Sequence, residues 1–251
     1  MKKPLSFLLV LALCCALTSC GGNKDTDDAV PQAPAASQPS ESAQPQAAPD
    51  ASSADVSNTS GPEEHDTEEN KILVAYFTYG ENAPLANGVD ASTSASIQYR
   101  GDALTGNTGL VADMIAGAAG GDLFSILTAE QYPDNYDDTL DTAQAEKGSR
   151  PELASRIDSL DSYNTVFLGF PNWWGDMPMA VYSFLDEYDF SGKTIVPFVT
   201  SGGSGFSNTI RAIESAESDA TVLDGLSING SHAPQAEDDV ADWLARLGLA
   251  G

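Results

Sequence analysis

Residues 71–77 read Lys71-Ile72-Leu73-Val74-Ala75-Tyr76-Phe77, and this stretch decides the fold class. It is a continuous β-rich apolar run, without the alternation of polar and apolar residues that a half-exposed strand has. Strands of parallel sheets are covered by helices on both faces and have this uninterrupted pattern. We therefore expect a buried parallel strand at the start of a single globular domain spanning residues 71–251.

Strand-like and helix-like segments alternate after this first strand. Further strands are expected at residues 122–127, 165–170, 194–199 and 220–228. Helices are expected at residues 108–119, 179–188, 208–216 and 237–247, with one more helix in the Tyr-rich connection after residue 127. This alternation predicts an α/β fold, a doubly wound five-stranded parallel sheet with helices on both faces. Ligands of such sheets bind beyond the carboxyl ends of the strands, so the loops there are the places to search.

Residues 1–19 have the pattern of a lipoprotein signal peptide. Lys2 and Lys3 precede an apolar run over residues 5–17, and Leu17-Thr18-Ser19-Cys20 follows. The apolar run is shorter than the about 20 residues that a spanning helix needs. The L-T-S-C sequence resembles a bacterial lipobox, whose cysteine is acylated and becomes the new N-terminus. We expect an extracytoplasmic protein anchored to the bacterial cell membrane through lipidated Cys20; ordinary secretion with Cys20 as a spare thiol is the alternative.

Residues 20–70 form the expected lipid-anchored linker. From residue 21 onward they are mostly Ala, Pro, Gln, Ser, Asp and Glu, with almost no large apolar side chain. Such a segment cannot bury enough surface to offset its conformational entropy, and the composition predicts disorder. A flexible coil of this length would hold the domain on the order of 40 Å from the membrane.

Charge and cysteine content exclude several classes of function. The formal net charge of −26 divides into +2 for residues 1–20, −10 for 21–70 and −18 for 71–251. An acidic domain of this kind disfavours nucleic acid and favours basic partners, although acidity can also serve solubility alone. All three cysteines precede residue 21, and His65 and His232 are the only histidines. We therefore expect no disulfide, thiolate nucleophile or metal centre in the domain.

The loop after the first strand has the chemistry of an anion site. Thr78-Tyr79-Gly80 follows the strand, and Thr105-Gly106-Asn107-Thr108 opens the first helix after a long polar excursion. Backbone N–H groups at a helix N-terminus bind anions without help from a basic side chain. The same residue types are also ordinary helix-capping chemistry, so this loop alone leaves both interpretations open.

The loops after the third and fourth expected strands suit a planar ligand. The third strand runs into Pro171-Asn172-Trp173-Trp174-Gly175, where two adjacent indoles of an extended segment point opposite ways. We expect one indole to pack on the domain and the other to cover a ligand; both could instead anchor the loop. The fourth strand ends in Thr200-Ser201-Gly202-Gly203-Ser204-Gly205, where glycine lets backbone approach a ring closely, although it could also be a flexible turn.

Together these loops resemble those of flavodoxin-like FMN-binding domains, specifically a bacterial lipoprotein branch of the family. In that family a T/S-x-T-G-x-T loop holds the phosphate, and the loops after strands three and four enclose the isoalloxazine ring. Other stretches that resemble the branch are 71–77, 132–136, Arg150-Pro151-Glu152-Leu153 and 190–194, so the similarity covers nearly all of residues 71–251. The resemblance implies a flavodoxin-like sheet of order 2-1-3-4-5 and FMN as the cofactor.

The resemblance also implies which residues bind the cofactor. They are Thr78, Tyr79, Gly106, Asn107, Thr108, Pro171, Asn172, Trp173, Trp174, Gly175, Thr200, Ser201, Gly202, Gly203, Ser204 and Gly205. The phosphate loop is normally a tight turn, whereas here residues 81–104 are inserted. We expect this insertion to bulge out as a flap, with Thr78 and Thr108 on either side of one phosphate. The flavin would be the reactive group, so no catalytic side chain is expected.

The function that the resemblance implies is electron transfer outside the cytoplasm, with a redox protein or small-molecule donor or acceptor as partner. An alternative is an FMN-dependent NAD(P)H:quinone or small-molecule reductase, which needs room beside the flavin for a second planar substrate. A different class of alternative is a non-redox lipoprotein whose fold serves as a binding module. Membrane contact is expected through the lipid anchor only, and no nucleic acid is expected as a partner.

Overall fold

The computed structural model describes residues 71–85 and 97–251. The expected signal peptide, the linker over residues 20–70 and the lipidation site Cys20 lie outside the described residues. Within the described residues, no helix is long and apolar enough to cross a membrane.

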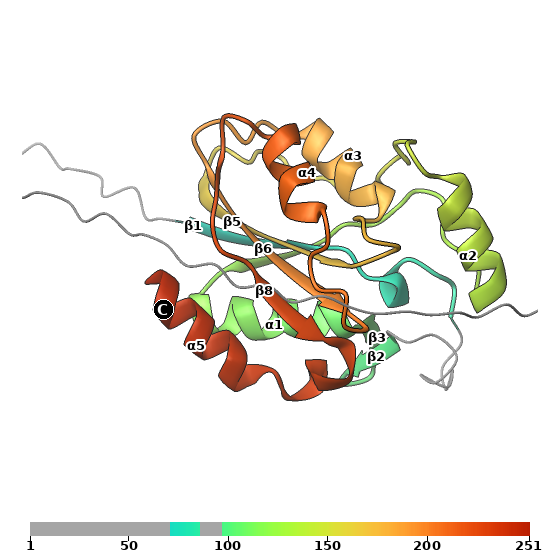
Figure 1. Cartoon of the computed structure of the whole chain (residues 1–251), viewed down its shortest axis with the longest axis horizontal. Helices are drawn as coiled ribbons and strands as arrows, with labels where there is room; N and C mark the ends of the chain where they lie inside the picture. The colour runs from blue at the N-terminus through green and yellow to red at the C-terminus, as the bar shows by residue number, and fades with distance from the viewer. Residues whose placement is uncertain (1–70, 86–96) are drawn as a thin grey trace, which may run out of the picture. The chain divides into compact units, whose positions relative to one another are not determined.

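A parallel sheet forms the centre of the domain, as the sequence predicts (Figure 1). Its order is β4-β1-β5-β6-β7, with β8 also paired to β6. The strands are β1 (Lys71–Tyr76), β4 (Asp122–Ser125), β5 (Tyr163–Pro171), β6 (Thr194–Ser201), β7 (Thr221–Val222) and β8 (Leu226–Asn229). The expected order of a flavodoxin-like sheet is therefore confirmed, since β4, the second strand of this sheet along the chain, lies beside β1 at the edge.

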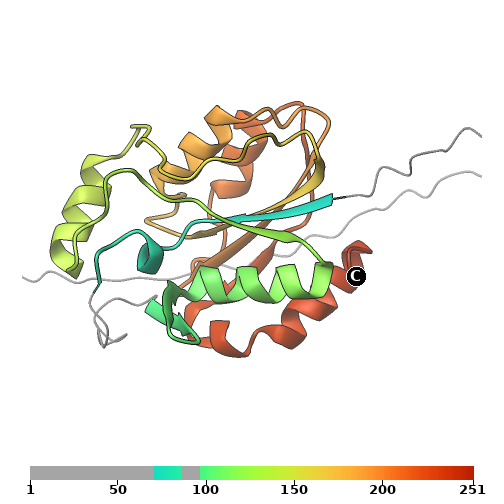
Figure 2. The ribbon, with the colours of Figure 1, turned by 180° about the vertical axis from the view of Figure 1, so that it is seen from behind.

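Helices cover both faces of the sheet. In Figures 1 and 2, α1 (Asn107–Ala119) and α5 (Glu237–Leu247) lie on one face, and α3 (Met179–Glu187) and α4 (Thr209–Ala216) lie on the other. Because side chains alternate along a strand, Val74 and Tyr76 pack in the cluster beneath α1 and α5, whereas Leu73 and Ala75 pack in the cluster beneath α3. This two-sided burial explains the uninterrupted apolar pattern of β1.

The fifth expected strand, residues 220–228, is divided in the structure. β7 pairs with the start of β6 and β8 with its end, and the chain leaves the sheet between them. Gly225 lies at the break, where an added Cβ would come 2.4 Å from the Phe206 ring and 2.7 Å from the Pro197 carbonyl oxygen. Only glycine fits so close an approach, so the strand pattern is interrupted by packing from the neighbouring loop.

The insertion after β1 differs from the expected flap in its described part. β2 (Ile97–Arg100) and β3 (Ala103–Gly106) form an antiparallel hairpin that leads directly into α1. The 3-10 helix η1 (Tyr79–Glu81) contacts this hairpin. The expectation of a segment bulging away from the domain is therefore wrong for residues 81–85 and 97–104, which fold back against the end of the sheet.

Two further elements stand at the carboxyl ends of the strands. The helix α2 (Tyr136–Ala145) is the helix expected in the Tyr-rich connection, and it stands beyond the strand ends (Figure 1). The 3-10 helix η2 (Gly230–Gln235) follows β8. Both elements border the region where ligands of such sheets bind.

Candidate functional site

A cavity of about 600 Å³ opens at the carboxyl ends of the strands. It is bordered by the ends of β5, β6 and β8, by the start of α1, by α2 and by the β2–β3 hairpin. Its lining residues are Tyr79, Ile97, Gln98, Asn107, Tyr136, Thr139, Leu140, Ala143, Pro171, Asn172, Trp173, Trp174, Thr200, Ser201, Gly202, Asn229, Gly230 and Ser231. Its size lies within the about 300–1,000 Å³ typical of small-molecule and cofactor sites.

The structure brings many of the predicted binding residues into this cavity. Those that line it are Tyr79, Asn107, Pro171, Asn172, Trp173, Trp174, Thr200, Ser201 and Gly202. The others are not among the lining residues: Thr78, Gly106, Thr108, Gly175, Gly203, Ser204 and Gly205. All of these others belong to the same strand-end loops, so the three loops do converge, and contact of the individual residues with a ligand stays a prediction.

The two adjacent tryptophans have different environments. The Trp173 indole packs edge-on against Phe77 and Tyr132, with ring centroids 5.5 Å away in both cases. The Trp174 side chain is 59% exposed at the cavity. The expected difference in packing is confirmed, since Trp173 anchors the loop to the core and Trp174 is exposed at the cavity, whereas coverage of a ligand by Trp174 stays a prediction. Burial raises the pKa of Tyr132 far above its usual range, so its phenol stays protonated and donates to Glu146 over 2.7 Å.

Asn172 connects the tryptophan loop with the loop after β6. Its Oδ1 accepts a hydrogen bond from the Gly175 amide at 2.8 Å, within a turn where Trp174 has a φ of 52° and Gly175 a φ of 84°. Its Nδ2 donates to the Gly205 carbonyl oxygen at 2.6 Å. One carboxamide thus fixes both loops, and it holds Trp174 in a left-handed conformation that side chains rarely adopt.

The loop after β6 and the start of α1 are also joined. The hydroxyls of Thr108 and Thr200, both buried, lie 2.8 Å apart. Ser201 Oγ accepts hydrogen bonds from the amides of Gly203 and Gly205, which shapes the glycine-rich turn. Thr78 and Thr108 are both buried and neither lines the cavity, so their expected places on either side of one phosphate stay a prediction.

The polar residues that line the cavity are neutral. No charged side chain of the described residues lines it, although the domain is strongly acidic. Hydroxyls and carboxamides face it at the start of α1, where no side chain of the described residues caps the helix N-terminus. Such a helix start has a partial positive charge that attracts anions, so a phosphate is compatible with this end of the cavity.

Three groups of lining residues were missed by sequence reasoning: Ile97 and Gln98; Tyr136, Thr139, Leu140 and Ala143; and Asn229, Gly230 and Ser231. Asn229 ends β8 and could have been found, because it follows an expected strand at its carboxyl end. Tyr136 ends the 132–136 stretch that resembles the family branch, but that resemblance assigned it no place in the site. The other residues of these two groups gave no local signal, because their places depend on how a hairpin and a helix pack at long range.

Two further observations concern possible metal ligands and the space next to the cavity. No group of three or more His, Cys, Asp or Glu side chains that could hold a metal ion occurs in residues 71–85 and 97–251. A second hollow of about 350 Å³ adjoins the main cavity and shares Ala143, Trp173 and Trp174 with it. The indole of Trp174 therefore borders both spaces.

Comparison with known families gives one match. The model of the family described as Flavodoxin matches residues 97–247. A search of curated proteins finds no match.

Two solved structures resemble the chain in fold and sequence. One is a protein of Bacteroides uniformis described as a flavoprotein, with 27% identity, a TM-score of 0.52, and coverage of 70% of this chain and 98% of its own. The other is a protein of Bacteroides eggerthii with the same description, 26% identity and a TM-score of 0.52, covering 71% of this chain and 98% of its own.

Proposed function

Because the chain belongs to the flavodoxin family, with FMN as its cofactor, we propose that it carries electrons outside the cytoplasm, anchored to the membrane through lipidated Cys20. The observation that carries this proposal is the cavity at the strand ends. It combines an exposed indole, Trp174, with neutral hydrogen-bond donors at the start of α1.

The residues present fit FMN in both of its parts. Asn107, at the start of α1, and Thr200 suit a phosphate, and Trp174 offers a flat apolar face to a ring. Main-chain groups of the Ser201–Gly202 segment suit the polar edge of a ring, because amides and carbonyls can approach it without a side chain between them. Bound FMN would supply one-electron and two-electron redox chemistry, and the protein would bind, orient and partly shield it.

The first test is cofactor loading and turnover of the purified full-length chain. We expect saturable FMN binding, reduction by a low-potential donor and reoxidation by an acceptor protein, with little turnover of NADH or NADPH. Failure to take up FMN under any condition would overturn the redox proposal and leave a binding module. Steady oxidation of NAD(P)H with a quinone, at rates of about 10 s⁻¹ typical of enzymes, would instead favour a reductase.

The reductase remains a second candidate because of α2. Tyr136 is 52% exposed and lines the cavity together with Leu140, and Ala143 lines both the cavity and the second hollow. Tyr136, Leu140 and Ala143 form an apolar wall of the main cavity beside Trp174 and offer space there for a planar organic substrate, while Glu146, Lys147 and Asp176 line the second hollow. Replacing Tyr136 by Ala would raise the KM for a quinone without changing FMN affinity if this candidate is right.

The lipid anchor is tested separately. The expected result for the full precursor is incorporation of labelled palmitate and recovery in the membrane fraction. The variant Cys20→Ser would lose the label and appear in the soluble extracytoplasmic fraction. Labelling that persists in Cys20→Ser would contradict the proposed anchor.

A further inference from the structure

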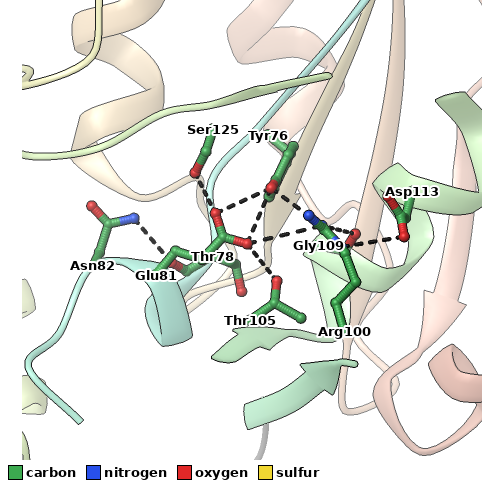
Figure 3. Close-up of polar contacts among 9 residues, drawn as sticks. All are labelled: Tyr76, Thr78, Glu81, Asn82, Arg100, Thr105, Gly109, Asp113 and Ser125. Carbon is green, nitrogen blue, oxygen red and sulfur yellow. Dashed lines mark hydrogen bonds and ion pairs between the residues drawn. The ribbon is translucent and has the colours of Figure 1, made fainter. Parts of the chain in front are cut away.

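A cluster of hydrogen bonds surrounds the carboxylate of Glu81, the last residue of η1 (Figure 3). Tyr76 donates its phenol hydrogen to this carboxylate, with 3.0 and 3.1 Å between its oxygen and the two carboxylate oxygens. The hydroxyls of Thr105 and Ser125 donate to it at 2.5 Å each. The Glu81 side chain is only 16% exposed. One carboxylate therefore joins β1, β3 and β4.

Arg100, at the end of β2, extends this cluster to α1. Its Nη2 donates to the Gly109 carbonyl oxygen at 3.1 Å and to the Tyr76 hydroxyl at 3.3 Å. Its Nη2 also lies 4.0 Å from Glu81, and its Nε lies 3.2 Å from Asp113 Oδ2. Figure 3 shows the guanidinium between these partners. Hydrogen bonds to partly buried charged groups are stronger than neutral ones, so the hairpin is held firmly to the sheet edge and to the first helix.

The backbone of η1 packs equally closely against the hairpin. A Cβ added to Gly80 would lie 1.9 Å from the Thr105 carbonyl oxygen, so only glycine allows this approach. Gly80 and Thr105, the two residues that flank the insertion over residues 81–104, are thus in contact. Because Ile97 and Gln98 of this hairpin line the cavity, the described part of the insertion forms one of its walls.

The same strand, β2, faces the cavity at its other end. Ile97 is 1% exposed and Gln98 is partly buried, and both line the cavity. Gln98 Nε2 donates to Asn107 Oδ1 over 2.7 Å, and Asn107 is the first residue of α1. Gln98 and Arg100 are two residues apart and so lie on one face of the strand. Anchoring of Arg100 therefore fixes the position of Gln98.

We infer that Gln98 is a positioning residue for the phosphate of FMN, acting through the carboxamide of Asn107 at the start of α1; this inference rests on the proposed function. A dianion held without basic side chains depends on neutral donors whose orientation is set before binding. Gln98 sets the orientation of Asn107, and the Glu81–Arg100 cluster holds Gln98. The insertion was expected to bulge away from the domain, but its β2–β3 hairpin thus supplies a residue that supports the phosphate end of the site.

The experiment compares FMN with riboflavin, which has the same ring but no phosphate. Both are titrated into the full-length chain, with flavin fluorescence as the readout, for wild type, Gln98→Ala and Gln98→Glu. A matched control is Gln235→Ala, an exposed amide in η2 that does not line the cavity. We expect Gln98→Ala to weaken FMN binding about tenfold and Gln98→Glu to weaken it further, with riboflavin binding unchanged by Gln98→Ala.

The outcomes separate the inference from the proposed function. A wild-type chain that binds neither flavin overturns the proposed function and this inference with it. Wild-type FMN binding that Gln98→Ala leaves intact overturns the inference alone. Equal weakening of FMN and riboflavin also overturns it, because a hairpin that merely supports the cavity would not distinguish the phosphate.

Discussion

At the scale of single residues, the two adjacent tryptophans have different roles, one in the stability of the fold and the other in the proposed binding of the cofactor. Trp173 is packed against Phe77 and Tyr132, whereas Trp174 is mostly exposed at the cavity. The sequence predicts this division from the alternation of side chains along an extended segment, but the structure produces it through a turn in which Trp174 has a φ of 52°. The sequence could not predict which tryptophan takes which role, since that depends on the turn that Asn172 stabilises.

Replacing Trp174 should therefore lower FMN affinity, whereas replacing Trp173 should lower the stability of the fold. Trp174→Ala should weaken FMN binding by about tenfold or more through the loss of ring stacking, with little change in melting temperature. Trp173→Ala should destabilise the fold by about 3 kcal/mol, because it leaves a cavity against Phe77 and Tyr132. Flavin fluorescence titration and thermal unfolding of both variants test this. Unchanged FMN affinity in Trp174→Ala would contradict the proposed role of its indole.

Glu81 gives a second prediction at this scale. Glu81→Gln preserves the shape of the side chain but removes the charge that three hydroxyls and Arg100 share, so we expect a loss of about 1–3 kcal/mol in unfolding free energy. Urea unfolding measures it. The exposed Asp161→Asn is a charge-matched control and should change stability by less than about 0.5 kcal/mol. Equal stability of Glu81→Gln and wild type would show that the cluster contributes little.

At the scale of elements, regular periodicity made most of the sheet and its helices predictable. β1, β5 and β6 have continuous apolar patterns because both their faces are buried, and α5 was predicted with the bounds that the structure gives. The β2–β3 hairpin was not predicted, because strands of four residues with mixed polarity give no period that distinguishes them from a loop. The missed Gln98 and the wrong expectation of a flap follow from this one omission.

Glu217, which directly follows α4, gives a prediction on how stability depends on pH. Burial, followed by the nearby carboxylates of Asp186 and Asp189, raises the pKa of Glu217 to about 7. In the unfolded chain this pKa is about 4.3, so the unfolded state releases its proton first and stability falls as pH rises from about 4.3 to about 7. Glu217→Gln cannot ionise, so its advantage over wild type should grow from near zero at pH 4 to a plateau above pH 7.

Urea unfolding of Glu217→Gln and wild type at pH 4 and pH 8 measures this difference. Glu214→Gln, an exposed position on the same helix, controls for the change in net charge. A gain of the same size at both pH values would show that the effect does not come from ionisation of Glu217.

At the scale of the whole molecule, the domain combines a neutral cavity with a strongly acidic remainder. Residues 71–251 have a formal charge of −18, and the cavity lining carries none of the charged side chains of the described residues. Cofactor binding and the predicted attraction of a basic partner would therefore involve different parts of the surface. The composition predicted the net charge, but only the fold shows that no charged side chain of the described residues lines the cavity.

This charge distribution predicts steering of a cationic redox partner. Electron transfer from the reduced, FMN-loaded chain to a basic acceptor such as cytochrome c should slow by about tenfold between low ionic strength and 0.2 M salt. Stopped-flow absorbance measures the rate. An anionic acceptor is the control, and its rate should rise or stay constant. A salt-independent rate with the cationic acceptor would contradict electrostatic steering.

The most direct test of the account is an equilibrium titration of the purified full-length chain with FMN. Convergence of three strand-end loops on one cavity predicts saturation at one FMN per chain, a dissociation constant in the micromolar range or tighter, and strong quenching of flavin fluorescence beside Trp174. Absence of saturable binding and of quenching would contradict the account.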